Sequence, residues 1–517
     1  MAIKFLPAAA LLLAGCTVGP DFQRPDLWSP ASWFRTRPTP ARGEASMPVA
    51  EPVDAEWWAA FRDPVLTGLV RRVAAGNLDV RAAAFRLAQS RAQRSVTAAD
   101  QFAQLNGNAS YTRQRISKQG VFSGFGSASP SGGASGSGAS SPGTQSNGLG
   151  GQQGGFPVGG TAIPPFDLFQ GGFDASWELD LWGRVRRAVE SADATLDASA
   201  EAQRAQLLSS IAEVARDYMQ LRGTQDTLRI TRGNLAAAGE SVRLTTERAR
   251  GGLATDLDVA NARAQLEATA ATVPQLEQQE AQGINAIGLL LGMAPAALRA
   301  ELSPRKPVPP VPPRVPVGLP SELARRRPDI RQAEAQLHAA TADIGAARAD
   351  FYPRLTLSGS VALQATQIKN LGFSAGTYSF GPSLTVPIFE GGRLRGTLQL
   401  REAQQQEAAV NYQRTVLQAF TEVDNALIAY AAEQRRRLRL AEQVAQSRRA
   451  FNLAQNQYRQ GVTDFLQVLT AQRTVLAAEQ QLSDSTATVS ANLVALYTRL
   501  GGGWEADLPI DGPVPKL

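Results

Sequence analysis

Few residues of this chain are of the types that carry out chemistry. The 517 residues include one histidine and one cysteine. His338 follows Leu337 in a helical pattern with no carboxylate beside it, which predicts a surface or packing residue rather than a proton shuttle. The sequence contains no cluster of metal ligands, no P-loop and no glycine-rich dinucleotide fingerprint. We therefore expect no catalysed reaction, no cofactor and no bound metal.

The charge pattern argues against a nucleic-acid partner. The formal net charge is +6, and basic runs such as Arg325 to Arg327 and Arg435 to Arg437 stand among residues of mixed sign. Such runs usually form solvated helix faces. We expect no nucleic acid to bind.

The cysteine stands at an informative place. Residues 1–15 contain Lys4 and an apolar run that is too short to cross a bilayer as a helix, which predicts a signal peptide. The four residues that end at Cys16 are similar to a bacterial lipobox, which implies that the Cys16 sulfur carries lipid. Thr17 follows the cysteine in place of Asp, and by the same resemblance this favours the outer membrane. With no second cysteine, no intrachain disulfide forms.

The sequence repeats itself. Asn77-Leu78-Asp79-Val80-Arg81 aligns with Arg327-Pro328-Asp329-Ile330-Arg331 at an offset of 250 residues, and Gly183 and Gly252 align with Gly392 and Gly461 at an offset of 209. The first half therefore carries 41 more residues than the second. We place them in residues 119–166, a Gly, Ser and Pro rich stretch that reads as a long loop.

Each half predicts two strands and a long helix. Residues 173–181, 355–363 and 378–388 alternate apolar and polar side chains, and residues 105–111 do so more weakly. Such alternation suits both a transmembrane barrel and a half-exposed soluble sheet. A helix over about 184–250 has a length of roughly 100 Å. Four strands cannot close a barrel, which needs about eight, so we expect oligomers. A dimer gives a barrel of eight strands whose interior is filled by side chains. A trimer gives twelve strands, which leave room for a channel.

These features resemble the outer-membrane efflux protein family, the TolC-like channels of tripartite pumps, and its NodT-type lipoprotein branch in particular. The resemblance rests on three motifs in the family's order: residues 16–22 after the signal, Trp57-Trp58 with the following residues 61–66, and residues 326–330 with 352–355. It implies a homotrimer in which a long α-helical coiled-coil barrel continues into a 12-stranded β-barrel, four strands per chain. The expected partners are a periplasmic adaptor (membrane fusion) protein, an inner-membrane pump and outer-membrane lipid.

The resemblance also assigns residues to the periplasmic entrance. The helix tips that contact the adaptor are expected at Gly252, Leu253, Thr255, Gly461, Val462 and Thr463. Glycine at such a turn permits the positive φ that reverses a helix pair. The gate that narrows the tunnel is expected at Asp258, Leu466, Arg473, Tyr458 and Thr470. Arg473 and Arg263 are rival partners for Asp258. The family often has aspartate where this chain has Gln467 and Thr470, which leaves Asp258 as the better candidate for an acidic ring.

The predicted organisation divides the chain into six parts. They are a signal peptide (1–15), a lipid-anchored extension (16–60), a first repeat (61–302), a Pro-rich connection (303–320), a second repeat (321–502) and a C-terminal tail (503–517). We expect the outer-membrane channel of a tripartite (RND-type) efflux system that exports small molecules. One alternative is the exit duct of a type I protein secretion system. Another, from a different class, is a structural coiled-coil surface protein, which explains the helices but not the duplicated strands.

Overall fold

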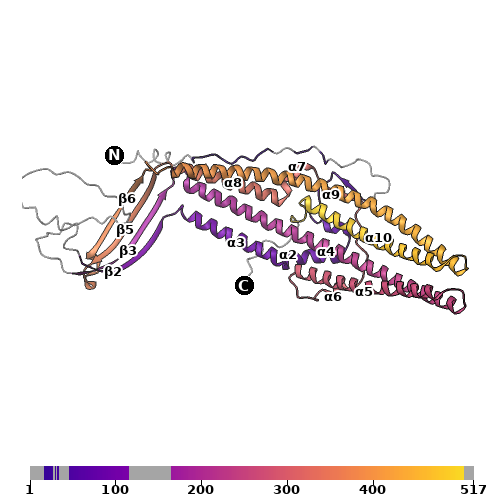
Figure 1. Cartoon of the computed structure of the whole chain (residues 1–517). Coiled ribbons are helices and arrows are strands. Elements are labelled where there is room, and N and C mark those ends of the chain that lie inside the picture. The colour runs from indigo at the N-terminus through magenta and orange to yellow at the C-terminus, as the bar shows by residue number, and fades with distance from the viewer. Residues whose placement is uncertain (1–16, 27–28, 31, 34–45, 116–164, 506–517) are drawn as a thin grey trace, which may run out of the picture. The chain divides into compact units, whose positions relative to one another are not determined.

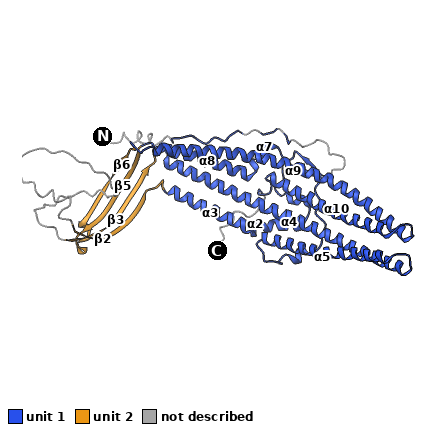
Figure 2. Ribbon diagram, viewed as in Figure 1, with its two compact units in different colours: residues 1–99, 181–352, 388–517 blue, residues 100–180, 353–387 orange. Residues whose placement is uncertain are grey.

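The computed structural model describes residues 17–26, 29–30, 32–33, 46–115 and 165–505. The chain divides into two compact units, each described separately below (Figure 2). The first, which is largely helical, takes in residues 1–99, 181–352 and 388–517, and the second, a sheet, takes in residues 100–180 and 353–387. The predictions for the signal peptide, Cys16 and nearly all of the Gly/Ser rich stretch lie outside the described residues.

The helical unit contains two hairpins of unusual length (Figure 1). In the first, α4 (Arg184–Arg250) turns into α5 (Asp256–Leu290), and in the second, α9 (Arg393–Arg459) turns into α10 (Phe465–Arg499). The predicted helix over 184–250 is thus confirmed. The other helices are α2 (Pro64–Gly76), α3 (Leu78–Ala99), α6 (Arg299–Leu302), α7 (Pro320–Arg326) and α8 (Pro328–Ala349), with the 3-10 turn η1 (Trp57–Phe61).

None of the helices in the described residues combines the length and the apolar character that a membrane span requires.

The two halves of the chain repeat each other element by element. The helices α3 and α8 each have 22 residues, α4 and α9 each have 67, and α5 and α10 each have 35. Their first residues differ by 250 for the α3–α8 pair and by 209 for the other two pairs, as the sequence alignment predicts. The internal two-fold repeat is confirmed.

The sheet unit is a four-stranded antiparallel sheet in the order β2-β3-β5-β6. Its strands are β2 (Gln104–Gln114), β3 (Phe166–Leu179), β5 (Arg354–Ala365) and β6 (Gly376–Thr385), with the 3-10 turns η3 (Ile368–Asn370) and η4 (Phe373–Ala375) between the last two. Two predicted boundaries are wrong. The strand expected over 173–181 begins earlier, at Phe166, which therefore does not belong to the loop, and the strand expected to reach residue 388 ends at Thr385.

The register confirms the predicted alternation of faces. Cross-strand partners share a face, and Phe173, Val361 and Tyr378 follow one another across three strands with exposures of 63%, 61% and 77%. The neighbouring row on the opposite face joins Asp174 and Ser360. The sheet thus exposes one apolar face, and its outer strands β2 and β6 each leave one edge without a partner strand in the described chain.

The core of the helical unit gathers around the two tryptophans of the second motif. Trp57 is fully buried, its ring stacks on Tyr497 with centroids 5.4 Å apart, and its Nε1 donates to the Gly502 carbonyl at 3.0 Å. A short parallel pair, β1 (Met47–Val49) with β4 (Arg314–Pro316), joins the N-terminal extension to the Pro-rich connection. The described part of the N-terminal extension, the connection and the residues just after α10 therefore share one core.

Candidate functional site at the hairpin tips

Both hairpins reverse through the same backbone turn. Leu253 N–H donates to the Arg248 carbonyl at 2.8 Å, and Val462 N–H donates to the Gln457 carbonyl at 2.9 Å. These are the six-to-one bonds of a Schellman motif, which requires a left-handed residue just after the helix. Gly252 and Gly461 occupy that position with φ of 72° and 76°, as predicted from the sequence.

The returning helices begin with different caps. In the first hairpin Thr255 and Asp258 form a reciprocal capping box, in which Asp258 Oδ2 accepts from the Thr255 N–H at 3.0 Å and from its hydroxyl at 2.9 Å. In the second hairpin Asp464 alone caps α10 and accepts from the Gln467 N–H at 3.2 Å. Asp258 thus has a structural task within its own chain, separate from any role at a gate.

Apolar side chains lie exposed at both tips. Leu253 and Val462 follow the turn glycines and are 69% and 72% exposed. Leu257 and Leu466 lie on the first turns of α5 and α10, with exposures of 68% and 61%. Exposed apolar groups that cluster in this way are typical of an interaction surface. Thr463 is half-buried beside them.

The five predicted gate residues do not form one cluster within the chain. Arg473 Nε donates to Gln265 Oε1 at 2.6 Å, and Thr470 Oγ1 donates to the carbonyl of Leu466 at 2.8 Å. In the part of the chain that is described, Asp258 makes no ion pair with Arg473 or with Arg263. The described part of one chain does not bring these residues together, so the gate stays a prediction.

Tyr458 is in a setting that the sequence did not predict. It is 3% exposed and packs against Phe465 in an edge-to-face arrangement, with Val468, Leu469 and Ala262 around the pair. Its hydroxyl has no hydrogen-bond partner in the described chain. Tyr458 therefore belongs to a small apolar cluster that joins the two hairpins.

Arg327, in the motif Arg326-Arg327-Pro328-Asp329, holds the open end of the second hairpin, opposite its tip. Arg327 is 7% exposed, so the prediction that its basic run forms a solvated face is wrong for this residue. Its guanidinium donates to Asp329 Oδ2 at 2.6 Å, to Glu422 Oε2 at 2.9 Å and to the Arg499 carbonyl at 3.1 Å. Burial opposes ionisation here, but the two carboxylates outweigh it and raise the pKa of Arg327.

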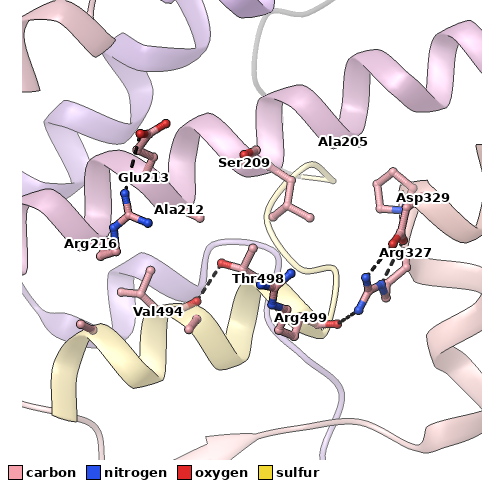
Figure 3. Close-up of a pocket in the computed structure, with 14 residues that line it drawn as sticks. Ala205, Ser209, Ala212, Glu213, Arg216, Arg327, Asp329, Val494, Thr498 and Arg499 are labelled. Atoms are coloured by element: carbon pink, nitrogen blue, oxygen red, sulfur yellow. Dashed lines mark hydrogen bonds and ion pairs between the residues drawn. The ribbon is translucent and has the colours of Figure 1, made fainter. Parts of the chain in front are cut away.

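Arg327 and Arg499 border a cavity of about 450 Å³ between α4, α8 and α10 (Figure 3). Its walls mix apolar groups such as Leu208 and Val494 with charges that already have partners, among them Arg216 and Glu213. In the first repeat, Asn77 stands at the position of Arg327. It makes the link to the end of the returning helix without a charge, because its side-chain amide donates to the Leu290 carbonyl at 2.8 Å.

The segment after Cys16 docks on the helical unit. Val18 N–H donates to the Trp182 carbonyl at 3.1 Å, and Asp21 Oδ1 accepts from buried Arg187 at 2.6 Å. The ring of Phe22 stacks on His338, whose Nε2 lies 3.0 Å from a carboxylate oxygen of Glu190. His338 is thus a packing residue, but the expectation that no carboxylate is near it is wrong.

Across the described ranges, no three His, Cys, Asp or Glu side chains are grouped so that they could hold a metal ion.

Sequence reasoning missed residues that connect the hairpins near their tips, among them Arg248 and Gln265. A cation in the last turn of α4 was visible in the sequence. Its reach to the other hairpin was not, because that contact joins residues 210 positions apart.

Comparison with known proteins gives a consistent result. A family model described as outer membrane efflux protein matches residues 69–293 and 319–502. The solvent efflux pump outer membrane protein SrpC of Pseudomonas putida is 33% identical over 509 residues, which cover 98% of this chain and 99% of SrpC. The pyoverdine export outer membrane protein OpmQ of Pseudomonas aeruginosa is 31% identical over 502 residues, with 97% of each chain covered.

A solved structure shares the fold over nearly the whole chain. The outer-membrane channel OprN superimposes with a TM-score of 0.81 at 35% sequence identity, and the match covers 95% of this chain and 100% of OprN. The repeated hairpins, the four-stranded sheet and the matching motifs therefore have one explanation. This chain belongs to the outer membrane efflux protein family and is an outer-membrane channel component of an efflux system.

Proposed function

We propose that three copies of this chain form a channel that carries small molecules outward through the outer membrane. The observation that carries the proposal is the open four-stranded sheet with one apolar face and two unpaired edges. A sheet in lipid must leave no open edge, and four strands are too few to close. Three copies supply twelve strands with apolar side chains toward lipid.

We place the periplasmic entrance at the hairpin tips. The exposed apolar side chains at Leu253, Val462, Leu257 and Leu466 support this placement, because they suit contact with a protein partner. That partner is a periplasmic adaptor, which meets Gly252, Leu253, Thr255, Gly461, Val462 and Thr463. An inner-membrane pump stands behind the adaptor.

The gate consists of Asp258, Leu466, Arg473, Tyr458 and Thr470. Asp258 and Leu466 lie within the first turn of their helices, close to each tip. Threefold symmetry repeats each of them around one axis, so that three carboxylates concentrate negative potential there. Leu466 adds an apolar ring, and the other three hold the helices that carry these groups.

Cys16 anchors the chain through lipid. The docking of residues 17–22 supports an ordered attachment just after the anchor, because Asp21 and Arg187 fix the segment. Cys16→Ser removes the sulfur nucleophile and is expected to abolish lipidation and weaken outer-membrane retention. Mass spectrometry of the mature N-terminus measures this, and an unacylated wild-type chain would contradict the anchor.

The cargo is a small molecule, and no reaction is catalysed. SrpC and OpmQ are named for different cargoes, solvent and pyoverdine, although both resemble this chain along nearly its full length. Selection by the inner-membrane pump accounts for such variety.

An export assay tests the proposal. Cells that lack this chain are loaded with a fluorescent efflux dye, and the full-length chain is restored on a plasmid. We expect dye export to recover, and native mass spectrometry of the extracted protein to give three chains per particle. Unchanged dye retention with the chain correctly inserted, or particles of two chains, would overturn it.

A further inference from the structure

Arg248 joins the two hairpin tips of a single chain. It lies in the last turn of α4, and its Nη1 donates to the carbonyls of Tyr458 and Arg459, at 2.8 Å and 3.1 Å, at the end of α9. The last carbonyls of a helix have no partner within it and carry its partial negative charge. A guanidinium is therefore well suited to cap the second hairpin from the first.

The contact is enclosed on one side, because Arg248 is half-buried and its bond to the Arg459 carbonyl is exposed. The Arg248 guanidinium carbon lies 4.7 Å from the centre of the Tyr458 ring, and Tyr458 is almost fully buried. A Cβ built on Gly461 falls 3.6 Å from Arg248 Nη2, so the side chain lies against the turn of the second hairpin. Hydrogen bonds and ring stacking shielded from water are stronger than the same contacts in solvent.

The link runs in one direction only. The repeat offset of 209 places Gln457 where the first half has Arg248, and Ala249 where the second half has Tyr458. Backbone N–H groups of the turn cap the ends of both α4 and α9, and in the second hairpin the Tyr458 carbonyl accepts from the Gly461 N–H as well as from Arg248. The contact of Arg248 with the end of α9, which we call the clasp, therefore occurs once in each chain. It involves two positions at which the halves differ.

We propose that Arg248 is a positioning residue of the entrance, which fixes the α9–α10 tip against the α4–α5 tip and so sets the resting aperture. The inference rests on the proposed function, because an aperture exists only in an assembled channel. Leu466 is the second residue of α10 and so belongs to the same tip. Release of the clasp frees this tip, so that the constriction becomes wider and more variable.

The test uses full-length trimers with Arg248→Gln, which keeps a polar side chain but loses the charge and the planar fork. The matched control is Arg243→Gln, which removes the same charge from the same helix. Among the described residues, Arg243 bonds only to Glu240 and Glu247 of its own helix, at 2.9 Å and 2.6 Å. Arg248→Lys keeps the charge without a planar group to stack on Tyr458. We expect its exchange rate and conductance to lie between those of the wild type and those of Arg248→Gln.

Two measurements are made on each variant. Hydrogen exchange of residues 458–463 should become roughly tenfold faster in Arg248→Gln, the factor that corresponds to the loss of about 1.4 kcal/mol. Single-channel conductance should rise in the same variant, while thermal stability of the trimer and both readouts of Arg243→Gln stay at wild-type values.

The outcomes separate the two proposals. Faster exchange with unchanged conductance would show a clasp that does not set the aperture, and unchanged exchange would show that there is no clasp. Either result overturns the inference while a conducting wild type leaves the proposed function in place. If the wild-type trimer conducts nothing, the proposed function fails, whatever the exchange data show.

Discussion

The two hairpin tips share a backbone and differ in their side chains. Both end in a Schellman turn with glycine at positive φ, and both place an exposed leucine two residues into the returning helix. The first tip has the Asp258 carboxylate where the second has the Gln467 amide, and it has Arg248 where the second has Gln457. The features that reverse the chain are thus duplicated, whereas the charges at these two positions occur only in the first tip.

This difference shows where the two halves have become specialised. A turn with positive φ and a helix cap are needed in any hairpin, whatever the hairpin does. The charges of Asp258 and Arg248 are not needed for the turn, because the second tip, whose returning helix Asp464 caps, reverses without them. We therefore assign the unshared charges to the entrance and the shared features to the fold.

The largest effect is expected at the other end of the hairpins, where Arg327 and Asn77 occupy equivalent positions. Arg327→Ala removes the buried donor from Glu422, which keeps Arg499 and Gln418, and from the Arg499 carbonyl, and should destabilise the chain by about 2–3 kcal/mol. Asn77→Ala loses one link and the cap of α3 and should cost about 1–2 kcal/mol. Urea unfolding of purified trimers compares them, with exposed Arg325→Ala as the control. Equal losses of unfolding free energy in Arg327→Ala and Asn77→Ala would mean that the buried charge adds nothing to stability.

The next effect concerns the unshared carboxylate. Asp258→Ala removes a negative charge from the entrance and should raise conductance and weaken cation preference. It also removes half of the capping box, at about 1 kcal/mol of helix stability. Gln467→Asp adds the missing carboxylate to the second tip and should strengthen cation preference. Reversal potentials in a salt gradient measure both, and a shift of the same sign in the two variants would refute the acidic ring.

The exposed leucines provide a comparison without charge. Leu466→Ala should raise conductance and make cells more permeable to bulky antibiotics, because it opens space at the constriction. Leu257→Ala removes an equally exposed leucine from the equivalent position of the first tip and should change conductance less. Single-channel recording ranks the pair, and a larger effect at Leu257 would place the constriction on the first hairpin.

The smallest effect is expected from the length difference between the halves. Removing about 40 residues within 120–163 shortens the β2–β3 connection toward the ten residues that separate β5 from β6. Loop length changes stability by only about 0.6 kcal/mol per doubling. Trimers on native gels and dye export should therefore stay near wild-type levels. Loss of trimers would show that the stretch has a structural role.

Much of the fold followed from local patterns. The offsets of the repeat carried the predicted helix over 184–250 to its partner in the second half, and period-two alternation found four strands, whereas the bounds of the other long helices were not predicted. Strand ends were less predictable: β3 continues through Gly171 and Gly172 to Phe166, because its ladder with β2 and β5 compensates for residues of low strand propensity.

The side-chain contacts were beyond such patterns. Arg327 reads as part of a basic run, and only tertiary packing places two carboxylates and a helix end around it. The resemblance assigned Tyr458 to the gate, yet packing against Phe465 buries its side chain. Contacts across 148 or 210 residues, such as those of His338 and Arg248, leave no periodic signal.

Single-channel recording of the purified full-length protein tests the central claim most directly. Three chains with twelve strands and an acidic entrance should insert into a planar bilayer and conduct in discrete, cation-preferring steps. Leu466→Ala should raise the step size above that of the wild type, and Leu257→Ala should change it less. Inserted trimers that give no steps, in the wild type and in Leu466→Ala alike, would contradict the claim that this chain forms a channel.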